Sequence, residues 1–281
     1  RKKQPDVRKK EKWKPYLDYV LKEQEWLKEH QEQELKELRS KDGLTLRAAY
    51  IPRENAKGTI ICMHGYHSTN DIEFVPEVRF LWNLGYSILL PWQRSHGKSE
   101  GRYITYGVKE RHDLKRWILY TNRHLAAKNK DIFLCGISMG CATTLMAAGL
   151  DLPDNVKGII ADCGFTSPWD IIKHVAKERF HLPPFPLMYM VDLISEVVAG
   201  FGLKEVSIPE IMKRNKIPVL FIHGDADDYV PMWMTIKNYE ACAAKKELYI
   251  VSGAGHALAF SKDMEEGKRR IKNFINKYKT I

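Results

Sequence analysis

The segment DIFLCGISMGCATTLMAAGL, residues 131–150, constrains the fold more than any other stretch of the 281-residue chain. Its apolar first part is typical of a buried strand, and its Ala- and Leu-rich second part favours a helix. Ser138 therefore lies on the turn between them, flanked by Gly136 and Gly140 in the spacing G-x-S-x-G. A Cβ at either glycine would collide with the neighbouring element, so a turn this tight needs glycine at both positions.

The position of Ser138 allows two interpretations. On a tight turn its hydroxyl would project above the sheet as a nucleophile, with the N–H of Met139 at the helix N-terminus able to stabilise an oxyanion. The alternative is that Ser138 only caps the helix. A nucleophilic serine needs a base and an acid from elsewhere in the chain, so the remaining segments decide between the two.

The rest of the chain alternates between strand-like and helix-like segments. Strands are expected at residues 37–40, 44–51, 58–64, 86–90, 131–137, 156–162, 217–223 and 247–251. Helices are expected at residues 15–36, 72–83 and 109–124, after Gly140, and at 262–278. The first two strands flank Asp42-Gly43, a dipeptide typical of a hairpin. This alternation predicts an α/β fold with a mostly parallel, doubly covered sheet of about eight strands.

Acidic residues and a histidine follow two of the later strands. Asp225, Asp227 and Asp228 come just after the strand at 217–223, and His256 comes just after the strand at 247–251. Working residues of parallel sheets gather at the carboxyl ends of strands. An imidazole can take the proton of a serine hydroxyl, and a carboxylate fixes the tautomer of the imidazole. The order Ser, Asp, His therefore predicts a catalytic triad; the alternative is an aspartate that only forms a turn and a structural histidine.

Four motifs together carry a family resemblance. They are HGY at residues 64–66, RSHGKSEG at 94–101, GISMG at 136–140 and HGDADDYVP at 223–231. With these motifs the chain resembles the α/β-hydrolase superfamily, and particularly its bacterial serine hydrolase and esterase branch. The likeness covers about residues 40–279.

The resemblance implies a role for each residue at a matching motif position. Ser138 would be the nucleophile, His256 the general base, and Asp227 the acid, because Asp227 occupies the aspartate position of the last motif. The backbone N–H groups of Tyr66 and Met139 would form the oxyanion hole.

One position departs from the family pattern. Similar proteins usually carry an aspartate two residues before Arg94, where this chain has Trp92. That aspartate is thought to be structural, so we expect the triad to be unaffected and the packing of the loop to differ. A further hypothesis is that Trp92 lines the substrate pocket.

About fifty residues between Cys163 and the strand at 217–223 exceed what a sheet connection needs. In α/β hydrolases such an insertion is typically a cap over the nucleophile, so we expect a cap at about residues 165–215. Its large side chains either form an apolar or aromatic acyl pocket or attach the cap to the body: Trp169, Phe180, Phe185, Met188, Tyr189 and Met190. His181 is expected at the surface, with a pocket donor as the alternative.

The five cysteines are odd in number and lie mostly in apolar segments. They are expected to be buried, reduced thiols of a reducing compartment, and their spacing matches no zinc site. Cys135 and Cys141 lie on either side of Ser138, so a catalytic thiol is an alternative to packing for these two.

The net charge of +10 is concentrated at the N-terminus. Residues 1–14 hold eight basic residues against two acidic ones, so this tail has a net charge of +6 and the remaining chain a net charge of +4. We expect a solvated end, with contact to an anionic membrane surface as the alternative. Nucleic acid is not expected as a partner, because no recognised binding motif accompanies the charge.

We divide the chain into a basic tail and N-terminal helix at residues 1–36 and a hydrolase domain at residues 37–281. No run is long enough to cross a bilayer and no secretory signal is present, which favours a cytoplasmic location. Because the chain begins with Arg1, membrane association through a segment upstream of it is the alternative.

The sequence thus predicts a serine hydrolase that cleaves carboxylic esters through an acyl-enzyme, with no metal, nucleotide or other cofactor. The expected substrate is a small-molecule ester with an apolar or aromatic acyl group. A peptidase or thioesterase with the same triad is the first alternative, and a non-catalytic binding protein on a hydrolase fold is the second. The sequence does not indicate the oligomeric state.

Overall fold

The computed structural model describes residues 11–31, 35–125 and 130–280. Within them a single sheet holds eight strands in the order β1-β2-β4-β3-β5-β6-β7-β8. The strands are β1 (Leu35–Arg39), β2 (Thr45–Ile51), β3 (Gly58–Met63), β4 (Ser87–Pro91), β5 (Asp131–Ile137), β6 (Val156–Asp162), β7 (Val219–Gly224) and β8 (Lys246–Val251). The predicted α/β fold is confirmed.

The sheet is antiparallel only at one side. β1 pairs with β2, and β2 with β4, in antiparallel register, and all the other neighbours pair in parallel. β1 and β2 form the expected hairpin, whose turn is closed by a hydrogen bond from the N–H of Leu44 to Ser40 Oγ. β5, which leads into Ser138, lies near the centre of the parallel part.

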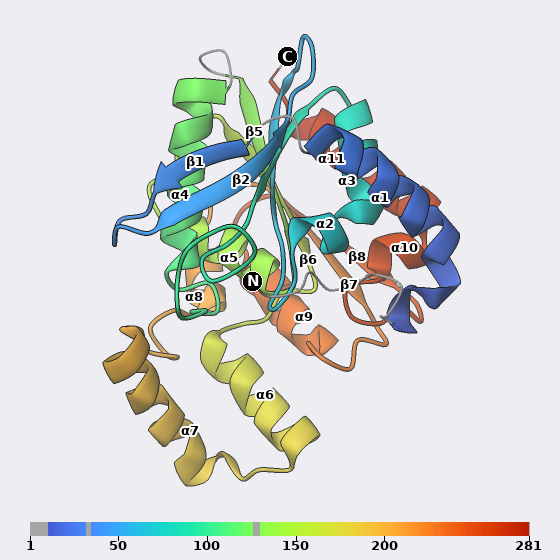
Figure 1. Ribbon diagram of the computed structural model, residues 1–281. Coiled ribbons are helices and arrows are strands. Elements are labelled where there is room, and N and C mark those ends of the chain that lie inside the picture. The colour runs from blue at the N-terminus through green and yellow to red at the C-terminus, as the bar shows by residue number, and fades with distance from the viewer. Residues whose placement is uncertain (1–10, 32–34, 126–129, 281) are drawn as a thin grey trace.

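Helices cover both faces of the sheet (Figure 1). One face carries α4 (Glu110–Tyr120), α5 (Met139–Ala147), α8 (Ile208–Met212) and α9 (Met232–Ala241). The opposite face carries α1 (Leu17–Gln31), α2 (Asn70–Glu73), α3 (Val75–Asn83), α10 (Ala259–Lys262) and α11 (Met264–Tyr278). A 3₁₀ helix η2 (Glu11–Tyr16) precedes α1, and a π-helical turn η3 (Thr121–Leu125) follows α4. Each face buries its own apolar cluster against the sheet.

The N-terminal helix packs on the body through an apolar stripe. Trp13, Val20 and Leu27 are buried on this stripe and join the cluster that includes α3. Residues 1–10, which hold most of the basic tail, lie outside the described residues. No helix of the described segments combines the length and apolar character that a membrane span requires.

Three helix predictions need correction. The expected helix at 15–36 ends at Gln31, and residues 35–36 belong to β1. The expected helix at 72–83 is divided at Phe74 into α2 and α3, because Pro76 cannot continue a helix from the preceding turn and instead opens the next one. The helix α9 was not predicted. Its buried face includes Thr235 and Asn238, so the apolar periodicity that signals a helix is weak there.

The chain between β6 and β7 forms a helical projection. It contains α6 (Pro168–Phe180), α7 (Pro184–Ile194) and the π-helical turn η4 (Ser195–Ala199), followed by α8. Figure 1 shows α6 and α7 extending away from the sheet and its covering helices. We call residues 168–199 the helical arm.

Candidate active site

Ser138 lies on the sharp turn between β5 and α5. Its backbone has φ 56° and ψ −119°, a conformation that non-glycine residues rarely adopt. A Cβ on Gly140 would lie 1.7 Å from the carbonyl oxygen of Met63, and a Cβ on Gly136 would lie 2.5 Å from that of Gly140. The two glycines therefore permit β5, α5 and the end of β3 to approach one another, and the turn holds Ser138 above the sheet.

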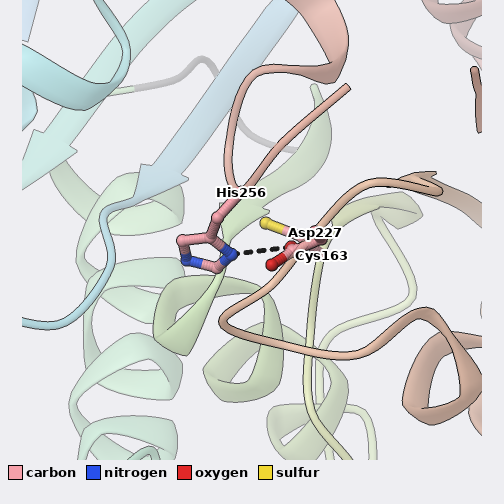
Figure 2. Close-up of side chains that lie close together, drawn as sticks. All are labelled: Cys163, Asp227 and His256. Carbon is pink, nitrogen blue, oxygen red and sulfur yellow. Dashed lines mark hydrogen bonds and ion pairs between the residues drawn. The ribbon is translucent and has the colours of Figure 1, made fainter. Parts of the chain in front are cut away.

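The ring of His256 lies between Ser138 and Asp227. Its Nε2 is 2.9 Å from Ser138 Oγ, and its Nδ1 is 2.7 Å from Asp227 Oδ2. Figure 2 shows the second contact, with the imidazole beside the carboxylate. The three residues follow β5, β7 and β8, whose carboxyl ends meet at one edge of the sheet. The structure thus brings together the three side chains that the sequence singled out.

Asp227 is buried, and both of its oxygens accept hydrogen bonds. Oδ1 accepts from the N–H groups of Tyr229 and Val230, each at 2.9 Å. Oδ2 faces His256 and lies 3.3 Å from Nε2 of His223. Burial alone would raise the pKa of this carboxyl, but the contacts with the two histidines outweigh burial and hold its pKa well below the usual value. Asp227 is therefore ionised at neutral pH.

The neighbouring aspartates contact other groups. Asp225 accepts a hydrogen bond from the N–H of Gly253 at 2.6 Å. Asp228 is exposed and lies 3.4 Å from the guanidinium of Arg179. The geometry therefore favours Asp227 over these two as the partner of His256.

The ionised Asp227 fixes the tautomer of His256. A carboxylate only accepts hydrogen bonds, so Nδ1 of the neutral ring carries the proton. Nε2 is then the unprotonated nitrogen, and it faces the hydroxyl of Ser138. This arrangement allows Nε2 to take the serine proton when the oxygen attacks an electrophile.

Two backbone segments that carry N–H donors lie beside Ser138. Met139 is the first residue of α5, so its N–H has no acceptor within that helix. The turn after β3 also passes the serine, since a Cβ placed on Gly65 would lie 3.2 Å from the Cβ of Ser138. Tyr66 follows Gly65 directly on this turn. Donors placed in this way can stabilise an oxyanion formed next to Ser138.

Cys163 lies close to the His256–Asp227 pair (Figure 2). One ligand atom from each of the three residues lies within 4.8 Å of the others, a spacing that a metal ion could bridge. Burial raises the pKa of the Cys163 thiol well above its usual value, so the sulfur stays protonated, whereas metals bind the thiolate. Nδ1 of His256 is already hydrogen-bonded to Asp227. The chemistry of these donors does not fit a metal site.

An apolar cavity of about 230 Å³ adjoins this site. It is lined by Tyr106, Ile171, Ile172, Val175, Ala176, Phe180 and Tyr229. Tyr229 connects the cavity to the site, because its ring centroid lies 5.1 Å from that of His256. Tyr106 stacks on Tyr66 with 5.2 Å between ring centroids. The other five lining residues all belong to α6, so the helical arm forms one wall of the cavity.

A second cavity, of about 790 Å³, lies away from these residues. It is lined by residues of β1, α4 and η3, among them Leu38 and Arg123. Its lining includes no triad residue and no aromatic ring that packs on His256, in contrast to Tyr229 of the first cavity, so we do not assign it to the same site.

Most of the arm residues expected in the pocket are elsewhere. Only Phe180 lines the cavity, whereas Met188 is buried in the core and Trp169 packs edge-on against Tyr189 at 5.4 Å. The cavity wall consists instead of aliphatic side chains on one face of α6. Composition indicated an apolar arm, but the rotation of each helix decides which side chains face the site. His181 is exposed, as expected.

Trp92 does not line the cavity either. It is 3% exposed, and a Cβ on Gly97 would lie 2.1 Å from Cδ1 of its indole ring. The loop at 94–101 therefore folds tightly over the tryptophan. The departure from the family pattern at this position affects the packing of that loop and not the cavity.

All five cysteines are buried free thiols, as expected. Burial raises the pKa of Cys141, and contact with Cys62 together with burial raises the pKa of Cys135. Both thiols therefore stay protonated, which does not fit the alternative of a catalytic thiolate.

Comparisons with known proteins agree with this geometry. A family model described as the prolyl oligopeptidase family matches residues 99–280, more than half of the chain. The uncharacterized protein YqkD of Bacillus subtilis is 28% identical over 234 residues, which cover 83% of this chain and 76% of that protein.

Two solved structures are similar to this chain over most of its length. The Pyrococcus furiosus esterase Pf2001 superposes with a TM-score of 0.71 at 25% identity, over 87% of this chain and 92% of that one. Est1E of Butyrivibrio proteoclasticus, solved with ferulic acid bound, superposes with a TM-score of 0.68 at 20% identity, over 86% and 98% of the two chains. At that identity the second likeness concerns the fold alone.

Proposed function

The chain belongs to the prolyl oligopeptidase family of the α/β-hydrolase superfamily, and from this premise we propose that it is a serine hydrolase that cleaves carboxylic esters through an acyl-enzyme on Ser138. The observation that carries the proposal is the hydrogen-bond chain from Ser138 through His256 to Asp227. In this chain Asp227 is ionised and Nε2 of His256 faces the hydroxyl of Ser138, which supports nucleophilic attack by that hydroxyl.

The first half of the reaction forms the acyl-enzyme. Ser138 Oγ attacks the ester carbonyl while its proton passes to Nε2 of His256, and Asp227 stabilises the resulting imidazolium. The N–H groups of Tyr66 and Met139 would hold the oxyanion, each lowering the barrier by about 2.7–4 kcal/mol. His256 then returns the proton to the leaving alkoxide, and the C–O bond of the ester breaks.

The second half releases the acid. Water takes the place of the alcohol, gives its proton to His256 and attacks the acyl carbon. The intermediate collapses, the proton returns to Ser138, and the carboxylic acid leaves. Every step in this scheme uses side chains or backbone groups of the chain itself.

The 230 Å³ cavity is the proposed site of the acyl group. Its size lies below the range of about 300–1,000 Å³ that accommodates drug-sized ligands, which supports a small acyl group over a long chain. Its aliphatic and tyrosine lining supports an apolar or aromatic acyl group. We propose that residues 165–215 act as a cap, since α6 contributes most of this lining.

A peptidase is the second candidate, because the matching family is described as that of prolyl oligopeptidase. The likeness to Pf2001, described as an esterase, favours esters. A thioesterase with the same triad remains a third reaction type. The five buried free thiols support a reducing, cytoplasmic location for whichever reaction occurs.

A labelling experiment tests the nucleophile and a substrate panel tests the reaction. A fluorophosphonate probe should form one adduct on the purified chain, located on Ser138 by mass spectrometry, and Ser138→Ala should take up none. The labelled wild type would exclude a non-catalytic binding protein. Initial rates on p-nitrophenyl esters, peptide p-nitroanilides and acyl thioesters should then be greatest for short-chain or aromatic esters; faster cleavage of anilides would assign a peptidase.

A further inference from the structure

The helical arm exposes an unusual concentration of large apolar side chains. Of the twelve exposed large apolar side chains in the described residues, nine lie between 180 and 198, with exposed fractions from 45% to 77%. We call these nine the arm face: Phe180, Leu182, Phe185, Tyr189, Met190, Leu193, Ile194, Val197 and Val198. No other part of the described chain shows a comparable cluster.

The arm face follows the helical repeat. Tyr189, Leu193 and Val197 are four residues apart, and Met190, Ile194 and Val198 form a second row with the same spacing. Phe185 lies before this repeat, at a kink where its backbone is extended. The opposite side of α7 is already packed, with Met188 fully buried. A helix that is apolar all round is normally buried on every side. The arm face is therefore a helix surface that the described residues leave largely uncovered.

The exposed area is large enough for a stable interface. With about 150–250 Å² for each of the three aromatic side chains, and somewhat less for each of the six aliphatic ones, the nine exposed fractions correspond to on the order of 1,000 Å². The largest apolar patch on a typical monomer is about 300–600 Å². A stable protein interface buries about 800 Å² on each partner. The arm face alone supplies that area.

The charges of the arm indicate whether a membrane surface or a protein surface covers the arm face. Residues 168–199 hold three basic residues, Lys173, Lys177 and Arg179. They hold four acidic residues, Asp170, Glu178, Asp192 and Glu196. An anionic membrane surface attracts a surplus of basic residues, which the arm lacks. Because its basic and acidic residues nearly balance, the arm is suited to contact a protein surface with a similar balance of charges.

We propose that the arm face docks on the arm face of a second copy of this chain, forming a two-fold symmetric dimer. In such an interface each copy presents the same surface, so an apolar face meets an apolar face of equal size. The two rows at intervals of four residues match the ridges that interdigitate when helices pack on one another. Phe180 belongs both to the arm face and to the cavity next to Ser138, so the partner copy closes the outer side of that cavity.

Sedimentation velocity on the full chain at micromolar concentration tests the proposal. This measurement does not depend on any catalytic activity. The wild type should sediment with twice the mass of the 32.6 kDa chain. The double variant Leu193→Lys with Val197→Lys should sediment as a monomer. Both side chains are exposed, so circular dichroism and the melting temperature should show that the variant is folded.

A matched control replaces an exposed leucine elsewhere. Leu119 on α4 is 48% exposed and lies outside the arm, so Leu119→Lys should remain a dimer. A wild type that stays monomeric, or a dimer that persists in the double variant, would overturn the proposal. Cosedimentation of a monomeric wild type, but not of the double variant, with vesicles of phosphatidylcholine and phosphatidylglycerol would assign the face to lipid instead.

Discussion

The N–H of Gly65 donates a hydrogen bond to the carboxylate of Glu73, which is buried at the end of α2. Gly65 lies on the turn after β3 that passes beside Ser138. The bond ties this turn to the helix that follows it. Because Tyr66 comes next on the turn, Glu73 fixes the backbone that carries one of the two proposed oxyanion donors.

Replacing Glu73 should therefore slow the chemical step. For Glu73→Ala we expect kcat to fall about tenfold or more with KM little changed, since one donor would be less well placed for the transition state. Glu73→Gln keeps an acceptor oxygen and should recover most of the rate. Steady-state kinetics on a p-nitrophenyl ester measure both. A KM effect without a kcat effect would argue against a role at the oxyanion.

Substitution of Ser138 should separate activity from stability. Ser138→Ala and Ser138→Gly should each lower turnover by about four orders of magnitude or more, because the nucleophile is gone. Ser138→Gly should in addition raise the free energy of unfolding by about 1 kcal/mol, since glycine relieves the strain at φ 56° against a modest loss of chain entropy. Urea titrations of the wild type, Ser138→Ala and Ser138→Gly measure the three free energies of unfolding. Equal stability of the Gly and Ala variants would mean that the turn is not strained.

Asp227→Asn should lower kcat by about 10⁴, because an amide no longer secures the tautomer of His256 or stabilises its charged form. The variant should still fold, since an amide oxygen can accept from the N–H groups of Tyr229 and Val230. Asp228→Asn is the matched control, and its rate should equal that of the wild type because Asp228 is exposed. A large loss of kcat in Asp228→Asn, and not in Asp227→Asn, would assign the role of the acid to Asp228.

Val175 should control the size of the acyl group that the enzyme accepts. Val175→Phe narrows the 230 Å³ cavity, so kcat/KM for p-nitrophenyl benzoate should fall about tenfold or more while that for the acetate stays nearly constant. Val175→Ala should shift the preference toward longer acyl chains. Equal losses on benzoate and acetate would show that the cavity does not hold the acyl group.

Asp162 should make the protein less stable as the pH rises. Burial raises the pKa of this carboxyl from 3.8 to about 6, and one of its oxygens has no hydrogen-bond partner among the described residues. The folded state then binds the proton more tightly than the unfolded state, so stability is lost between pH 4 and pH 6 and stays lower above it. The shift corresponds to about 3 kcal/mol.

Asp162→Asn removes this titration. The difference in unfolding free energy between variant and wild type should therefore grow from pH 4 to pH 7 in favour of the variant, by a few kcal/mol at most. Urea titrations at several pH values measure it. A difference that does not change with pH would show that Asp162 titrates normally.

Local patterns in the sequence were sufficient for the eight strands and for the three polar residues of the site, but not for α9 or for the division between α2 and α3. The tight turn at Ser138 follows from two glycines that no other residue could replace. Asp227 and His256 follow strands β7 and β8, and the carboxyl ends of parallel strands share one edge whatever the details of packing. Spacing along the chain was therefore enough to predict their meeting.

Tertiary structure alone decided which side chains surround them. The sequence could not show that Ile171 and Val175 face the site while Tyr189 and Met190 face outward, because that depends on how α6 and α7 are rotated against the body. Nor could it show that Trp92 is buried, since its environment is formed by a loop folding back over it. Backbone turns and strand ends are determined by local sterics, whereas pockets and exposed faces depend on contacts between segments far apart in the chain.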